Sequence, residues 1–173
     1  AKTLAWGYFD HPPLVAFMIH LGTQLFDNEL GVRLVSCIFS AGSYVFLWLC
    51  IDNPKKNQYV LNFFLLVFSM TLMNAYGFLT LPDTPLLFFT AVFLWLYKQY
   101  LVKPSWGIAI GLGLTMAAVM YSKYHGVLVI LFVLFSNLKL LKDARAWTAV
   151  GIALLCYTPH FYWLFENDFV SAR

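Results

Sequence analysis

The chain has 173 residues, of which 61% are hydrophobic, 19% aromatic and only 11% charged, and its formal net charge is +3 at pH 7. So much apolar surface excludes a soluble domain of this size, and the composition predicts a protein of the lipid bilayer. The sequence has no basic run with interleaved aromatic residues of the kind that follows a nucleic-acid backbone, so we expect no nucleic-acid partner.

The first distinctive stretch is Tyr-Phe-Asp-His-Pro-Pro-Leu, at residues 8–14. Two consecutive prolines cannot both lie inside a helix, so Asp10 and His11 are predicted on a loop that leads into a helix starting near Pro13. The apolar run at residues 14–26 is too short to cross a bilayer, and polar side chains recur on one of its faces. We therefore expect an outward loop and a juxtamembrane interfacial helix within residues 1–28.

The remaining apolar runs predict an all-α fold, a polytopic bundle of transmembrane helices. The runs are separated by turn residues, including Asp27-Asn28 and the sequence Asp-Asn-Pro-Lys-Lys-Asn at residues 52–57. Gly107, Gly111 and Gly113 are interpreted as points of close helix packing. About six spans are predicted, roughly at residues 29–50, 58–75, 85–102, 106–120, 127–141 and 147–163.

Charge is distributed unevenly between the two sides of this predicted bundle. The segments 52–57, 98–104 and 139–145 hold seven of the eleven Lys and Arg residues, and alternation of the spans places all three on one side. An excess of positive charge marks the cytoplasmic side. The opposite, outward side then carries Asp10, His11, Asp83 and Lys123.

Each candidate residue on the outward side has a structural and a functional interpretation. Asp83 lies in Leu-Pro-Asp-Thr-Pro-Leu (81–86), where Asp83 or Thr84 could cap a helix, but a carboxylate at the bilayer edge also indicates a functional site. Lys123 could extend toward lipid head groups or contact a lipid-linked phosphate. His125 and His160 fit interfacial or helix–helix hydrogen bonding better than ligand binding.

Three ordered stretches then suggest a family: Trp-Gly-Tyr-Phe-Asp-His-Pro-Pro-Leu-Val (6–15), Asn-Glu-Leu-Gly-Val-Arg-Leu-Val-Ser (28–36) and Leu-Pro-Asp-Thr-Pro-Leu-Leu-Phe-Phe (81–89). They resemble the integral-membrane glycosyltransferases of the protein O-mannosyltransferase and lipid A aminoarabinose transferase superfamily, called GT-C. Ser-Lys-Tyr-His-Gly (122–126) and Pro-His-Phe-Tyr-Trp (159–163) fit its bacterial branch. On this resemblance, residues 1–173 form part of a single GT-C-type transmembrane domain.

The resemblance implies an enzyme that moves a sugar from a polyprenyl- or dolichyl-phosphate donor to a lipid, glycan or protein on the outward face of a bacterial inner or plasma membrane. It implies catalytic roles for Asp83 and Asp10, donor-phosphate contacts for His11 and Lys123, and a divalent metal ion with Asp10 as a ligand. In such enzymes an aspartate base lies before the Tyr-Phe-x-x-Pro-Pro stretch. The chain begins after that point, so we expect an incomplete fragment of a longer protein.

Two other function classes fit the composition. A multi-pass transporter or flippase-like protein could move a lipid-linked or small polar substrate without chemistry, and a structural scaffold would leave Asp10 and Asp83 as residues at helix starts. Transporters place ionisable groups and broken helices near mid-membrane. Here the charges gather at one predicted surface, which favours the glycosyltransferase.

Overall fold

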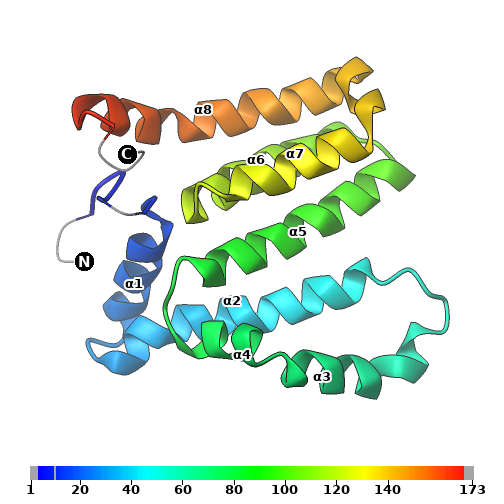
Figure 1. The fold of residues 1–173 in the computed structure, drawn as a ribbon, viewed down its shortest axis with the longest axis horizontal. Coiled ribbons are helices and arrows are strands. Elements are labelled where there is room, and N and C mark those ends of the chain that lie inside the picture. The colour runs from blue at the N-terminus through cyan, green and yellow to red at the C-terminus, as the bar shows by residue number, and fades with distance from the viewer. Residues whose placement is uncertain (1–3, 10, 170–173) are drawn as a thin grey trace.

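The computed structural model describes residues 4–9 and 11–169, and this part of the chain is helical, without strands (Figure 1). The prediction of an all-α bundle is confirmed. In chain order the elements are α1 (Leu14–Leu25), α2 (Glu29–Cys50), the 3₁₀ turn η1 (Lys56–Tyr59), α3 (Val60–Ser69), α4 (Thr71–Phe78), α5 (Asp83–Val102), α6 (Trp106–Ser122), α7 (Gly126–Ser136), the 3₁₀ turn η2 (Leu138–Lys142) and α8 (Ala144–Glu166).

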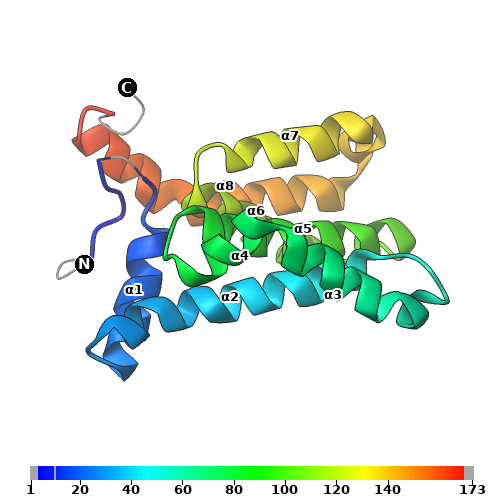
Figure 2. The same ribbon diagram turned by 60° about the horizontal axis from the view of Figure 1, so that its bottom comes forward.

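The long helices lie side by side and α1 crosses them at one end (Figures 1 and 2). Helix α5 packs between α2 and α6, and α6 packs against α8. We call the end that carries α1, the start of α5 and the α6–α7 turn the α1 end. The opposite end, which carries the end of α5, the start of α6 and η2, is the lysine end.

The loops predicted to share one side do meet at the lysine end. The Lys98 ammonium at the end of α5 donates to the carbonyl oxygen of Cys50 at 3.3 Å and pairs with Asp52 at 3.5 Å. The Arg145 guanidinium at the start of α8 donates to the carbonyl oxygen of Pro104 at 3.1 Å. The charge asymmetry read from the sequence is therefore a property of the fold, and the cytoplasmic position of this end stays a prediction.

Local sequence signals fix the helix starts. The Asn28 side chain caps α2 by accepting hydrogen bonds from the backbone N–H groups of Leu30 at 2.9 Å and Gly31 at 3.3 Å. The helix therefore starts where Asp27-Asn28 was predicted to separate two apolar runs. Asp143 caps α8 by accepting from the N–H of Arg145 at 3.0 Å. Helix α1 begins directly after Pro13, as the double proline predicts.

The segment predicted as one span at residues 58–75 is instead two helices, α3 and α4, bent by 74° at Met70. Asn74 stabilises the bend, because its side-chain amide donates to the carbonyl oxygens of Val67, Phe68 and Met70 at 3.0–3.1 Å. Its own carbonyl oxygen accepts from the Tyr44 hydroxyl at 3.1 Å. Backbone groups freed by a break at membrane depth must be paired within the protein, and Asn74 does this.

Length and composition identify the helices that can cross a membrane. Among the described residues α2, α5 and α8 are long and apolar enough, and the bent pair α3–α4 would be a fourth span. Helix α6 has 17 residues and α7 has 11, because the chain leaves the α-helix at Ser136 and continues as η2. The fold therefore has three or four full-length candidates, with α6 and α7 as shorter apolar helices beside them.

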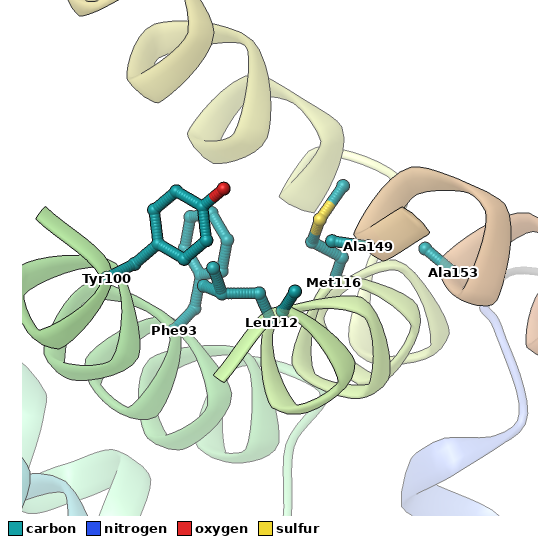
Figure 3. Close-up of a cluster of buried hydrophobic side chains, with 7 residues drawn as sticks. Phe93, Tyr100, Leu112, Met116, Ala149 and Ala153 are labelled. Atoms are coloured by element: carbon teal, nitrogen blue, oxygen red, sulfur yellow. The ribbon is translucent and has the colours of Figure 1, made fainter. Parts of the chain in front are cut away.

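A cluster of buried hydrophobic side chains joins α5, α6 and α8 (Figure 3). Gly113 lies directly against α8, where a Cβ atom would approach the carbonyl oxygen of Ala149 to 2.6 Å. The packing interpretation of the glycines is confirmed at this position, whereas Gly107 faces open space. The buried side chains of the cluster are Phe93, Tyr100, Ala109, Leu112, Met116, Ala149 and Ala153.

Candidate functional site

Two residues predicted separately as site residues form an ion pair at the α1 end. The Lys123 ammonium, directly after α6, donates to the carboxylate of Asp83, the first residue of α5, at 2.9 Å. The Asp83 side chain is 28% exposed and that of Lys123 is 31% exposed. The pair is therefore partly shielded from water but open to a ligand at the surface of the bundle.

The pair excludes the capping interpretation of Asp83. Pro82 occupies the N-cap position of α5, and the side chains there form no capping hydrogen bond. The Thr84 hydroxyl instead donates to the carbonyl oxygens of Tyr76 and Leu79, which ties the start of α5 to the end of α4. The carboxylate of Asp83 is thus directed to Lys123 and not to the helix backbone.

The turn at residues 123–126 presents Lys123 in a fixed position. The backbone N–H of Gly126 donates to the carbonyl oxygen of Lys123 at 2.8 Å, and α7 starts at once. A Cβ atom at Gly126 would approach the carbonyl oxygen of Val119 to 2.6 Å, so a larger residue would push the turn away from α6. The chain therefore makes a tight turn between the runs predicted at residues 106–120 and 127–141.

A buried histidine joins this turn to the N-terminal loop, residues 4–9 and 11–13. The side chain of His160 in α8 is 0% exposed, its Nε2 lies 3.1 Å from the Tyr124 hydroxyl, and its Nδ1 lies 2.6 Å from the carbonyl oxygen of Trp6. Because a carbonyl oxygen only accepts, Nδ1 carries a proton and donates to Trp6. His160 is therefore a hydrogen-bonding residue, but its partners lie in a turn and in the N-terminal loop and not on a neighbouring helix.

The N-terminal loop lies close against the end of α8. Gly7 is buried, and a side chain there would overlap the ring of Trp163. Pro12 and Pro13 are buried, whereas His11 is exposed. Within the described residues the His11 imidazole forms no hydrogen bond or ion pair, so its contact with a donor phosphate stays a prediction. Asp10 lies outside the described residues, and both roles predicted for it remain predictions.

The two other described histidines outside the N-terminal loop differ from His160 in their surroundings. His125 is exposed in the α6–α7 turn. His20 lies on α1 with its Nε2 atom 3.5 Å from the side-chain nitrogen of Gln24, on the predicted polar face. In the described residues no group of three or more His, Cys, Asp or Glu side chains is placed to hold a metal ion.

Comparison with known proteins assigns this chain to a family. Residues 10–163 match the family described as dolichyl-phosphate-mannose-protein mannosyltransferase. The chain belongs to this family. The match supports a GT-C type glycosyltransferase, as the motifs predicted, and the apolar helices agree with an integral membrane protein. No curated protein and no solved structure gave a match.

Membership of the mannosyltransferase family supports, at a coarse level, a membrane enzyme that uses a dolichyl-phosphate-linked sugar. The Asp83–Lys123 pair joins residues from two of the motifs that indicated the family, at 81–89 and 122–126. The hydrogen bond between Tyr124 and His160 connects a third motif, at residues 159–163, to the motif at 122–126. The separate motifs therefore converge on one end of the bundle.

Proposed function

We propose that this protein transfers a sugar from a polyprenyl- or dolichyl-phosphate donor to a lipid, glycan or protein acceptor, with the α1 end as the outward face of a bacterial inner or plasma membrane. The observation that carries the proposal is the ion pair between Asp83 and Lys123 in a chain of the mannosyltransferase family. The positive lysine end supports this orientation, because basic residues gather on the cytoplasmic side.

Lys123 is proposed to bind the donor phosphate. An ammonium group has three N–H donors, and the contacts of the described residues use one of them, to Asp83. The remaining donors can bind phosphate oxygens, for which lysine acts as a point charge. Lys123 lies in the turn directly after the end of α6, and we expect this turn to lie at the membrane interface, where a lipid-linked phosphate would be.

Asp83 is proposed to hold the Lys123 ammonium in place. The Asp83 carboxylate already accepts a hydrogen bond from the Lys123 ammonium at 2.9 Å, so it is better placed to orient Lys123 than to accept a proton from an acceptor substrate. The catalytic role proposed for Asp83 is therefore electrostatic. Proton removal is left to another carboxylate, and Asp10 on the N-terminal loop is the candidate within this chain.

His11 and the divalent metal ion complete the proposal. His11 is exposed on the loop that precedes α1 and could add a second donor to the phosphate. Any metal ion would need Asp10, because Asp83 already has a cationic partner and carboxylate oxygens are the ligands that hard divalent ions prefer.

The test is sugar transfer by the full-length protein supplied with radiolabelled polyprenyl-phosphate sugars. We expect Asp83→Asn, Asp10→Asn and Lys123→Gln to lose transfer while still inserting into membranes. Asp27→Asn is the matched control, because Asp27 is an exposed carboxylate near the same end of the bundle. Normal transfer by both Asp83→Asn and Lys123→Gln would disprove the proposed site.

The same assay separates the enzyme from a transporter. Broken helices are typical of transporters, and the described residues contain such a break at Met70. The side-chain amide of Asn74 donates to the carbonyl oxygens of Val67, Phe68 and Met70 there, so the bend is stabilised within the protein without a substrate. A labelled acceptor supports the enzyme. Movement of the labelled donor across vesicles without any product would support transport instead.

A further inference from the structure

An apolar groove lies away from the candidate site, toward the lysine end. Its volume is about 240 Å³, and it runs between α5, α6, α7, η2 and α8. Its floor is made by Phe93, Tyr100, Leu112, Met116 and Ala149, which Figure 3 shows converging from three helices. The groove is partly open to the surface of the bundle, so in a bilayer its apolar wall would be covered by an apolar molecule.

The groove wall is apolar even where it contains tyrosines. The Tyr100 hydroxyl donates to the Asp143 carboxylate at 2.6 Å, and the Tyr97 hydroxyl accepts from the Asn137 side-chain amide at 3.2 Å. Both polar groups are therefore already paired and offer nothing to a polar ligand. An apolar cavity stays dry or takes an apolar molecule, and in a bilayer the available apolar molecule is a lipid chain.

The end of the groove lies at the depth expected for lipid head groups. Trp147, which lines the groove, is 57% exposed, and Trp106 at the start of α6 is also exposed at the same end. Tryptophan is enriched at the membrane–water interface. A lipid chain in the groove would therefore leave its head group beside η2, where Leu140 and Leu141 also line the groove.

Two lysines at η2 are free to receive that head group. Lys139 and Lys142 are exposed, and neither ammonium forms a hydrogen bond or ion pair within the described residues. Lys98 and Arg145 at this end are engaged, since Lys98 pairs with Asp52 and Arg145 with Asp143. What distinguishes Lys139 and Lys142 is that they flank Leu140 and Leu141, which line the groove. Unpaired lysines at a head-group surface attract anionic lipids.

We propose that this groove binds one acyl chain of an anionic phospholipid, with the head-group phosphate held by Lys139 and Lys142. The site lies at the opposite end of the bundle from Asp83 and Lys123, so it goes beyond the proposed function and does not depend on it. It predicts a structural lipid in the leaflet at the lysine end.

The proposed site is tested by measuring which lipids stay bound to the purified protein. The full-length protein is released from nanodiscs of mixed phosphatidylglycerol and phosphatidylcholine, and bound lipids are counted by native mass spectrometry. We expect phosphatidylglycerol to be retained, and the Lys139→Gln/Lys142→Gln variant to retain it about tenfold less. The control Lys55→Gln/Lys56→Gln removes the same charge from the same end but away from the groove, and we expect it to retain the lipid.

A second pair of variants tests the groove itself. Val133 lines the groove near Ile130, so Val133→Phe should fill it and displace the lipid with both lysines intact. Leu128→Phe adds the same ring to an exposed position of α7 and should have no effect. Equal retention of phosphatidylcholine, equal losses in both lysine variants, unchanged retention in Val133→Phe, or displacement by polyprenyl phosphate would each overturn the proposal.

Discussion

The Lys123 ammonium and the Asp83 carboxylate lie 2.9 Å apart although forty residues separate them in the chain. The contact joins the end of α6 to the start of α5 and is partly exposed. Pairs in such positions contribute about 0–1 kcal/mol to stability. The arrangement is therefore better explained by what the charges bind than by what they add to the fold.

Exchange of the two charges separates these roles. In the variant Asp83→Lys/Lys123→Asp the ion pair can re-form, so we expect thermal stability in detergent close to that of the wild type. We also expect sugar transfer to be lost, because the phosphate would now meet a carboxylate at position 123. Transfer restored by the exchange, relative to Asp83→Lys alone, would show that the pair is only structural.

His160 is expected to fix the N-terminal loop. Replacement by Phe removes the hydrogen-bond partner of the Tyr124 hydroxyl and of the Trp6 carbonyl oxygen, both only partly buried, so the cost falls below the about 1–3 kcal/mol of a fully buried unpaired group. We expect faster hydrogen exchange in residues 4–13 and a lower melting temperature. His125→Phe is the matched control, since that ring is exposed in the adjacent turn.

A smaller change sharpens this prediction. His160→Gln keeps a side-chain donor and an acceptor, so it should recover part of the protection of residues 4–13 that His160→Phe loses. If both variants exchange as slowly as the wild type, the bond to Trp6 does not hold the loop.

Signals that act over a few residues were readable in the sequence. The double proline placed the start of α1, and the turn residues Asp27-Asn28 marked the break before α2. The sharing of one end by the basic loops also followed, because alternating helices leave few other arrangements. The helix starts depend on residues that are close together in the chain, and the placement of the loops depends on the number of apolar runs between them.

Contacts between distant residues were not readable in the same way. Trp6 and His160 are 154 positions apart, and nothing in either segment specifies the other as its partner. The bend at Met70 was missed because α3 and α4 are both apolar, with no proline at the break, so hydropathy is continuous across it. The polar Asn74 within that apolar run was the available signal, since a lone amide in a membrane helix requires partners.

Asn74 is expected to be required for the bend. Asn74→Leu removes the side-chain donor to three backbone carbonyl groups, of which those of Val67 and Met70 keep a backbone N–H partner. It also removes the acceptor of the partly buried Tyr44 hydroxyl, and a buried polar group left unpaired costs about 1–3 kcal/mol. We expect a marked fall in melting temperature in detergent. Asn62→Leu makes the same substitution at an exposed position of α3 and should be nearly neutral, whereas equal effects of the two variants would contradict the role of Asn74.

Acid should weaken the lysine end through Asp143. Hydrogen bonds from the Tyr100 hydroxyl and from Arg145 lower the pKa of the Asp143 carboxyl from 3.8 to about 2. A carboxyl whose pKa is lower in the folded state adds stability above its unfolded pKa and loses it as the pH falls toward the folded value. The contribution of Asp143 is therefore complete above about pH 4 and disappears between about pH 4 and pH 2.

The measurement compares melting temperatures of the wild type and Asp143→Asn between pH 2 and pH 6. The variant should be less stable at pH 6, because it loses the charge that caps α8 and accepts from Tyr100, and the difference should shrink as the pH approaches 2. Asp52→Asn is the control, since that side chain is 92% exposed and pairs only loosely with Lys98. A difference between wild type and Asp143→Asn that stays constant across this range would show that Asp143 is not the group that titrates.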